Sequence, residues 1–264
     1  SINPLFKLVY SIRDRLLAIL GKNIRDTGAL GLAEALLIGY RNNLDKSLLN
    51  VYANTGVVHV IAISGLHLGL IYAILMYITG KLTRRKSRKM IQMLLVIPAL
   101  WVFSLATGAS ASVIRSAVMF TLLCFGQLLG RKSHSMNAVA ASAFLLLCYF
   151  PSWITDTGFL LSYAAVSGIL LYQRRITQSC FFSNPLALKF WESISLTLAA
   201  QILTTPLVLF YFHRFPLLFL FTNLVAVPLS SLILILELLL CAFGLAGLPA
   251  DQIGQLIEVL INFL

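Results

Sequence analysis

The sequence predicts an all-α membrane protein: a polytopic transmembrane helical bundle with broken or short helices and an N-terminal amphipathic interfacial helix. Hydrophobic residues make up 59% of the 264 residues and charged residues only 11%, whereas an ordinary soluble domain has about 25% charged residues. The mean hydropathy is +0.91. Most of the net charge of +11 lies between the apolar runs, as in the loops of multi-helix membrane proteins. These observations exclude a soluble globular domain.

The first helix is predicted within residues 1–26. Its apolar side chains recur at helical spacing and its charged ones lie largely off that stripe, so it is expected to lie on the membrane surface. The apolar segment 28–40 contains Glu34 and is too short for a span, so it is either re-entrant or packed at the interface. Residues 27–264 are predicted to form one transmembrane domain. The sequence starts at Ser1, without methionine or a signal peptide, so we expect it to be a piece of a longer protein.

Long apolar runs predict the membrane-crossing helices, because a span needs roughly 20 apolar residues. The predicted spans lie near residues 55–79, 91–107, 113–129, 137–150, 158–172 and 193–212. Proline removes a backbone donor, so Pro206 is expected to kink or break the last of these. Pro228 is expected to divide 216–246 into a half-helix and a full span. Residues 251–263 are amphipathic.

The connections between these spans alternate in charge. Basic residues gather at 81–89, 131–132 and 174–175, and they include Arg84, Arg85, Lys86, Arg131 and Lys132. The connections 107–112 and 151–157 are nearly free of charge. Cytoplasmic loops carry an excess of Lys and Arg, so the basic connections are predicted to face the cytoplasm.

Polar residues interrupt an otherwise apolar segment at 47–80, which has no Asp, Glu, Lys or Arg. It contains His59, Ser64 and His67, together with the closely spaced Gly65 and Gly69. Ser64 and His67 are neighbours on one helical face, and the glycines allow another helix to approach closely. The segment is either a tight helix crossing with bonded polar side chains or the lining of a wet pathway. No third ligand or H-E-x-x-H pattern accompanies the histidines, so zinc is not expected.

Two charged residues stand out in the centre of the chain. Arg115 either snorkels to the membrane interface or faces the bundle interior, where it would pair with a phosphate or with Asp156. Ser112 lies one turn before Arg115 on the same face. Asp156 is either the N-cap of the helix that follows or a partner of Arg115.

The remaining polar residues suggest no catalytic site. Gln201, Thr204 and Thr205 precede Pro206 and could satisfy backbone groups that the proline frees, while Glu237 lies in a long apolar run without an evident partner. The sequence has no C-x-x-C pair, so neither a disulfide framework nor a thiolate metal site is expected. It also lacks G-x-x-x-x-G-K-[ST] and H-x-H-x-D-H. We therefore expect no ATPase, no metallo-β-lactamase-type nuclease, no cofactor and no metal ion in this sequence.

Five motifs, in this order, resemble the competence membrane domain of ComEC-type DNA-uptake proteins. They are His59-x-x-Ala-Ile-Ser-Gly-Leu-His67-x-Gly69; Thr107-Gly-x-x-x-Ser112-x-x-Arg115-Ser-x-x-Met119; Gly130-Arg131 with Asn137-Ala138; Asp156-Thr-Gly158-Phe-Leu-Leu-Ser162-Tyr163; and Gln201-x-x-Thr-x-Pro206 with Phe212-His213-x-Phe-Pro216. The resemblance covers residues 30–245 or so. Leu160 replaces a usual glutamine, which puts any role of that side chain in doubt. Ser116 replaces a usual alanine, a change expected to be harmless.

The resemblance implies that residues 27–264 are a competence-type channel domain of the bacterial inner membrane, which passes one DNA strand into the cytoplasm during transformation. The residues implied to line the pathway are His59, Ser64, Gly65, His67, Gly69, Ser112, Arg115, Asp156, Ser162 and Gln201, with Tyr163 as a further candidate. The basic loops would hold the emerging strand. Implied partners are single-stranded DNA, the lipid bilayer, a DNA receptor, and cytoplasmic motor and strand-binding proteins; an oligomer is left open. The family's OB-like domain and frequent nuclease-like domain are not in this sequence.

Two other classes of function remain open. A small-molecule secondary transporter would fit broken helices at Pro206 and Pro228. An intramembrane serine protease would use Ser64 as nucleophile and His213 as base.

Overall fold

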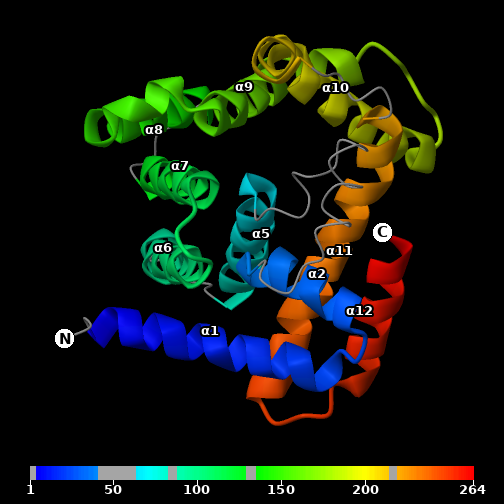
Figure 1. Ribbon diagram of the computed structural model, residues 1–264. Helices are drawn as coiled ribbons and strands as arrows, with labels where there is room; N and C mark the ends of the chain where they lie inside the picture. Colours follow the sequence, from blue (N-terminus) through cyan, green and yellow to red (C-terminus); the bar gives the residue numbers. More distant parts are fainter. Residues whose placement is uncertain (1–3, 41–63, 83–87, 129–134, 214–218) are drawn as a thin grey trace.

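The computed structural model describes residues 4–40, 64–82, 88–128, 135–213 and 219–264. Every regular element in these ranges is helical (Figure 1). The helices are α1 (Pro4–Asn23), α2 (Thr27–Ile38), α5 (Gly65–Leu82), α6 (Arg88–Ala106), α7 (Ala111–Leu128), α8 (Ser135–Tyr149), the short 3-10 helix η1 (Pro151–Thr155), α9 (Thr157–Thr177), α10 (Pro185–Phe212), α11 (Phe219–Leu245) and α12 (Asp251–Phe263). The predicted all-α class is confirmed.

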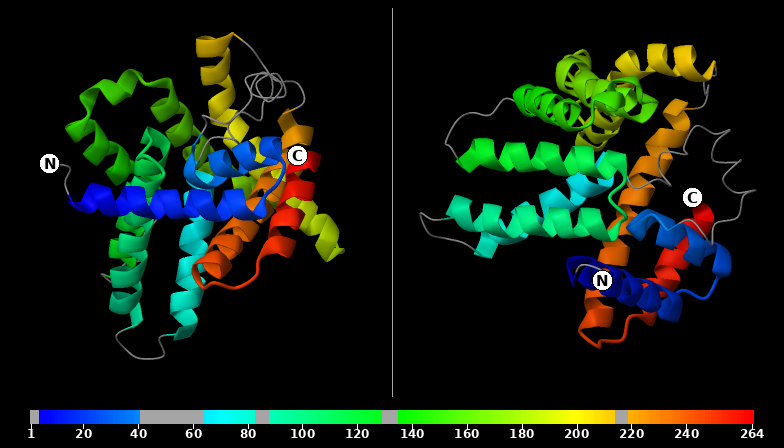
Figure 2. Two further views of the ribbon diagram at one scale, coloured as in Figure 1. Left: turned by 60° about the horizontal axis from the view of Figure 1, so that its bottom comes forward. Right: turned by 60° about the vertical axis from the view of Figure 1, so that its left-hand side comes forward.

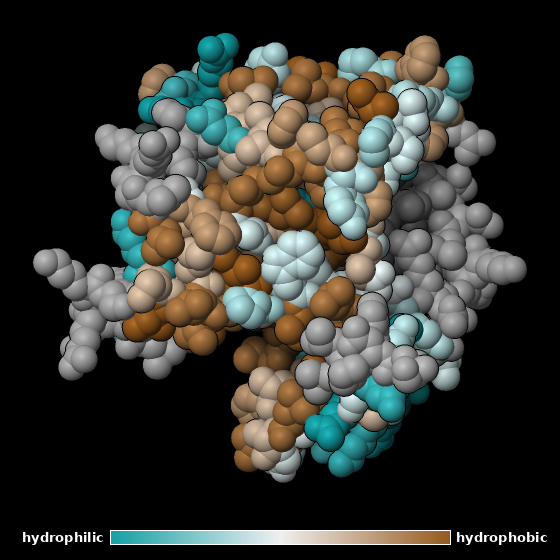
Figure 3. Space-filling model, turned by 90° about the vertical axis from the view of Figure 1, so that its left-hand side faces the viewer, coloured by the Kyte–Doolittle hydropathy of each residue, from teal (hydrophilic) through white to brown (hydrophobic). Residues whose placement is uncertain are grey.

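Four helices of the described chain are long and apolar enough to cross a membrane: α6 from Lys89, α7, α10, and α11 from Leu220. Large apolar side chains cover much of the outer surface of these helices. Figure 3 shows a face on which apolar side chains dominate and hydrophilic ones gather toward the margins. An apolar surface of this extent fits contact with lipid, because soluble monomers rarely expose large apolar patches.

Three other predicted spans are less complete. The span predicted at 55–79 is described only from Ser64, and its helix α5 is one of the shorter apolar helices. Residues 137–150 form α8, which has only 15 residues, fewer than the roughly 20 that a straight crossing needs. Residues 158–172 lie within α9, which is long but not among the helices apolar enough to span. It ends in Arg174 and Arg175.

Proline breaks neither helix: the division predicted at Pro228 is wrong, and of the kink or break predicted at Pro206 the break is wrong. Helix α10 continues through Pro206 and α11 through Pro228. In α11 the hydroxyls of Ser230 and Ser231 both donate to the carbonyl of Val227, at 3.0 and 2.8 Å. These bonds do not reach the carbonyl of Leu224, which is the one that Pro228 leaves without its amide partner. Residues 219–245 nevertheless form one helix and not a half-helix plus a span.

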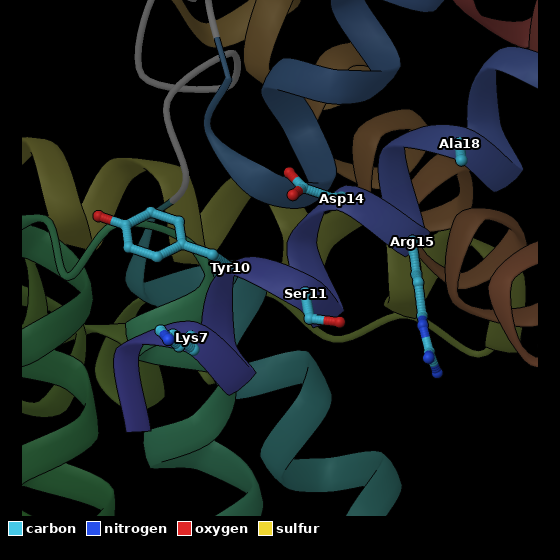
Figure 4. A pocket seen from close by; sticks show the side chains of 6 residues that line it. All are labelled: Lys7, Tyr10, Ser11, Asp14, Arg15 and Ala18. Carbon is cyan, nitrogen blue, oxygen red and sulfur yellow. The ribbon is translucent and has the colours of Figure 1, made fainter. Parts of the chain in front are cut away.

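Helix α1 is amphipathic, as predicted. Its apolar residues Leu16, Leu17, Ile19 and Leu20 pack into the core. The opposite side carries Lys7, Tyr10, Ser11, Asp14, Arg15 and Ala18, all of them exposed (Figure 4). In the left view of Figure 2, α1 runs across the direction of α5 and α6. This orientation fits the predicted position along the membrane surface, which remains a prediction.

The described core has two apolar clusters. One joins α1, α2, α11 and α12 around residues such as Leu36, Ile233 and Ile257, and the other joins α5, α6 and α7 around Leu68, Leu100 and Val113. Helix α2 begins at an exposed N-cap, Asp26, is largely buried from Ala29 to Ile38, and ends at the C-cap Gly39, where φ is 74°. The short segment predicted at 28–40 is therefore a core helix between α11 and α12.

Candidate functional site

Ser64 and His67 form a polar group at the start of α5. The His67 Nδ1 atom accepts the backbone N–H of Ser64 at 3.1 Å and lies 3.0 Å from the Ser64 hydroxyl. The Ser64 carbonyl in turn accepts the N–H of His67. A side chain at the third helical position that reaches back to the N-cap amide is the arrangement of a capping box. The predicted proximity of these two residues is confirmed, and one consequence is a capped helix start.

Gly65 and Gly69 mark a close crossing of α5 with α7. A Cβ atom at Gly65 would lie 2.6 Å from the Ser116 hydroxyl oxygen, and one at Gly69 would lie 3.3 Å from the Phe120 ring. The Ser116 hydroxyl donates to the Ser112 carbonyl at 3.0 Å. The predicted glycine contact is therefore present. Ser116, which the sequence suggested was incidental, lies in the middle of it.

Arg115 is buried inside the bundle, with 3% of its surface exposed. Within the described chain, its Nε and Nη1 atoms have no hydrogen-bond partner. The guanidinium carbon lies 6.0 Å from the ring centroid of Phe159 on α9, which is within cation–π range. Arg115 therefore faces the bundle interior, and the alternative of an arginine that snorkels to the interface is wrong.

Asp156 caps helix α9 next to this arginine. Its carboxylate accepts the backbone N–H of Phe159 at 2.6 Å, so the predicted N-cap is confirmed. A Cβ at Gly158 would lie 3.2 Å from the Asp156 carboxylate and 3.9 Å from Arg115 Nη2. The two charged groups thus flank Gly158, but Arg115 and Asp156 form no ion pair in the described structure. The predicted pairing between them is not observed.

Aromatic rings flank Phe159 along the chain, with Trp153 before it in η1 and Tyr163 after it in α9. The Phe159 and Tyr163 rings are 4.5 Å apart, and Trp153 lies 6.2 Å from Phe159 on the other side. The Tyr163 hydroxyl lies 3.0 Å from that of Ser142 on α8. Sequence reasoning named Tyr163 but missed Phe159, Trp153 and Ser142. The density of aromatic residues at 149–163 was the available signal.

Comparison with known proteins identifies the family. A family model described as Competence protein matches residues 36–264. The chain belongs to this family. ComE operon protein 3 of Bacillus subtilis is 32% identical over 198 residues, which is 75% of this chain and 24% of that protein. Recombination protein 2 of Haemophilus influenzae is 26% identical over 268 residues, which is 95% of this chain and 34% of that protein.

Two further comparisons complete this result. An uncharacterized protein of Aquifex aeolicus is 29% identical over 162 residues, 61% of this chain. No solved structure matches the chain. Because the chain spans about a quarter to a third of the length of the first two relatives, it corresponds to one part of those proteins.

Helix α7 brings most of the competence-motif residues together. It packs on α5, α6, α8 and α9. Helix α5 brings Ser64, Gly65, His67 and Gly69 to one side of α7. Helix α9 and its N-cap bring Ser162 and Asp156 to another side. Ser112 and Arg115 lie on α7 itself. Neighbouring residues of one helix point in different directions, so Ser116 meets α5 while Arg115 meets α9. The predicted set is therefore divided between two faces of α7.

The other predicted residues lie apart or outside the described ranges. Gln201 is on α10, which packs on α9 and α11, and its side-chain oxygen accepts the Thr204 and Thr205 hydroxyls, each at 3.2 Å. The Thr204 hydroxyl also bonds the carbonyl of Ala200, not the Ile202 carbonyl that Pro206 leaves free. Outside the described residues are His59, Arg84, Arg85, Lys86, Arg131 and Lys132.

A surface hollow of about 530 Å³ lies along α1 (Figure 4). All six residues that line it belong to this single helix, so it is an open face of α1. It is separate from Arg115 and the competence motifs.

Proposed function

We propose that this competence-family chain forms a membrane passage for single-stranded DNA and acts in DNA uptake during transformation. Membership of the competence family supports the role in uptake, and the helices of membrane-crossing length support a passage through a bilayer. The names of two relatives refer to a competence operon and to recombination, which fits DNA as the molecule handled.

The observation that carries the proposal is the buried Arg115. An unpaired charge inside a protein costs several kcal/mol, and a cation within a membrane segment normally marks a pathway or a ligand site. Two of its nitrogen atoms, Nε and Nη1, are buried and have no hydrogen-bond partner in the described chain. The planar guanidinium can bind phosphate oxygens through two parallel hydrogen bonds, so a passing DNA phosphate is the anion that suits it.

Other residues would serve the same pathway. Ser64 and His67 at the start of α5, and Ser112 one turn before Arg115, supply polar groups near α7. Ser162 lies on α9 after the Asp156 cap, and Gln201 would act further along, on α10. The basic loops at 81–89 and 131–132 would hold the emerging strand on the cytoplasmic side.

The proposed setting is the bacterial inner membrane, which the chain would cross several times. A DNA receptor outside and motor and strand-binding proteins in the cytoplasm are the partners that a strand-passing channel would need. We infer no catalytic step in this part of the protein; cleavage or ATP hydrolysis would take place elsewhere.

The two alternative functions receive less support. The transporter hypothesis relied on broken helices, but α10 and α11 are continuous through their prolines. For the protease hypothesis, Ser64 lies against His67, while His213 is exposed at the C-cap of α10. The proposed nucleophile and base belong to helices with different neighbours, because α5 packs on α6, α7 and α11, whereas α10 packs on α9 and α11.

Substitution of Arg115 tests the proposal. Arg115→Gln should reduce internalisation of labelled DNA at least about tenfold, since a hydrogen bond to a charged group contributes about 1.5–3 kcal/mol. Arg115→Lys keeps the charge but loses the planar fork, so it should retain part of the uptake. The matched control is Arg175→Gln, which removes an exposed arginine of α9. Full internalisation by Arg115→Gln at normal protein abundance would remove Arg115 from the pathway.

A further inference from the structure

Five aromatic rings form a continuous series, and its fourth ring, Phe159, lies beside Arg115. The aromatic series consists of Tyr149 at the end of α8, Phe150 after it, Trp153 in η1, and Phe159 and Tyr163 in α9. Successive ring centroids are 4.7, 4.6, 6.2 and 4.5 Å apart. Phe159 also lies under the Arg115 guanidinium. Each ring thus touches the next, from the connection between two helices to the buried cation.

Exposure falls over the first four rings of the aromatic series, and Tyr163 at its end is half-buried. Tyr149 is 79% exposed and Phe150 37%, Trp153 is half-buried, and Phe159 is 4% exposed. Phe150 and Trp153 are stacked, with 14° between their planes. At the inner end the hydroxyl of Tyr163 lies against that of Ser142. The series therefore offers accessible ring faces at its outer end and fixed rings at its inner end.

This arrangement combines the two chemical groups that a nucleotide needs. A flat base can stack on an exposed ring face whatever the sequence of the strand, and a phosphate can bind an unpaired guanidinium. A base pair within a duplex already has both faces stacked on its neighbours, so only a single strand could use the aromatic series. The exposed Asp156 carboxylate beside Arg115 would weaken phosphate binding, and a strand that must move on requires weak binding at each position.

Lipid is the competing ligand, since tryptophan and tyrosine are also enriched at membrane interfaces. One observation favours the nucleotide. The series leads inward to a cation that is 3% exposed, whereas an interfacial belt would keep its polar groups at the surface.

We propose that Tyr149, Phe150, Trp153, Phe159 and Tyr163 form a base-stacking path that receives single-stranded DNA and passes it to Arg115. This inference rests on the proposed function and adds how the strand is recognised: by the faces of its bases as well as by its phosphates. The path would begin in the nearly uncharged connection between α8 and α9.

Photocrosslinking tests the contact directly. A single-stranded oligonucleotide that carries 5-iodouracil is added to membranes that contain the protein, irradiated, and the crosslinked peptides are mapped by mass spectrometry. Crosslinks should fall on Tyr149, Phe150 or Trp153. Unlabelled single strand should compete at least about tenfold better than an abasic oligonucleotide of equal length, because stacking contributes about 1–3 kcal/mol per base. Crosslinks confined to other segments, or equal competition by the abasic strand, would overturn the proposal.

Uptake by variants separates this inference from the proposed function. Trp153→Leu should lower DNA internalisation about fivefold or more, whereas Trp153→Phe keeps a ring and should stay near wild type. Phe210→Leu, which removes an exposed ring of α10, is the matched control for lipid contact. If Trp153→Leu is normal while Arg115→Gln fails, base stacking is wrong and the passage stands. If Phe210→Leu and Trp153→Leu fall equally, the rings serve the membrane interface and not DNA.

Discussion

Replacing Gly65 by alanine probes the closest observed approach of α5 to α7. The new Cβ would lie 2.6 Å from the Ser116 hydroxyl oxygen and 3.7 Å from the Ser116 Cβ. The first distance is a clash and the second is ordinary van der Waals contact. Relief by rotation of the hydroxyl would break its 3.0 Å bond to the Ser112 carbonyl. That bond contributes about 0.5–1.5 kcal/mol, and overpacking that moves the backbone costs about 1–3 kcal/mol.

Rotation of the hydroxyl is the cheaper relief, so we expect Gly65→Ala to lower the free energy of unfolding by about 0.5–1.5 kcal/mol. Ser116→Ala removes the clashing oxygen, so the double variant should recover most of this loss. The measurement is a double-mutant cycle in which the unfolding free energy of the purified protein is followed in mixed micelles. Gly21→Ala is the matched control, because a Cβ there would meet nothing within 4 Å. The reasoning would be refuted if Gly65→Ala changed the free energy of unfolding no more than Gly21→Ala does. It would also be refuted if adding Ser116→Ala to Gly65→Ala restored none of the lost stability.

Three further predictions concern other parts of the chain. Asp156→Ala should lower the free energy of unfolding by about 1 kcal/mol and Asp156→Asn by less, because asparagine can still cap α9; thermal unfolding of both variants checks this. Glu237 is fully buried and neither oxygen of its carboxyl group has a partner in the described chain, so Glu237→Gln should keep normal abundance in the membrane, because a neutral amide of nearly the same shape fits the same space without a charge to bury; a marked loss of abundance on immunoblots would contradict this. In intact cells, Arg174→Cys should resist a membrane-impermeant thiol reagent and Ile154→Cys should react with it; the reverse pattern would overturn the predicted orientation.

Local sequence signals predicted much of this structure. The Asp156 cap could be predicted because an N-cap depends on an acceptor and the next few backbone amides. The Gly65 and Gly69 contact could be predicted because small residues four apart form a smooth strip on one helix face. The start of α2 at Asp26 depends on similarly local chemistry, as its carboxylate accepts the amides of Gly28 and Ala29.

What the sequence did not reveal depends on packing between distant segments. Arg115 and Phe159 lie far apart in the chain, and only the packing of α7 against α9 places the guanidinium over the ring. Pro228 indicated a break, yet α11 is continuous and packs on α1, α2, α10 and α12. The role of Ser116 was also hidden, because a residue's spacing on its own helix does not indicate which neighbouring helix it meets.

Passage of DNA across a membrane is the central claim, and voltage-driven transport in a planar bilayer tests it most directly. The purified protein is inserted, single-stranded DNA is added to the outer side, and the far chamber is assayed for that strand by amplification. Our account predicts voltage-dependent current blockades and recovery of single strands in the far chamber, with little recovery of duplex DNA and reduced recovery for Arg115→Gln. Blockades without recovered DNA, or equal recovery of duplex and single strands, would contradict it.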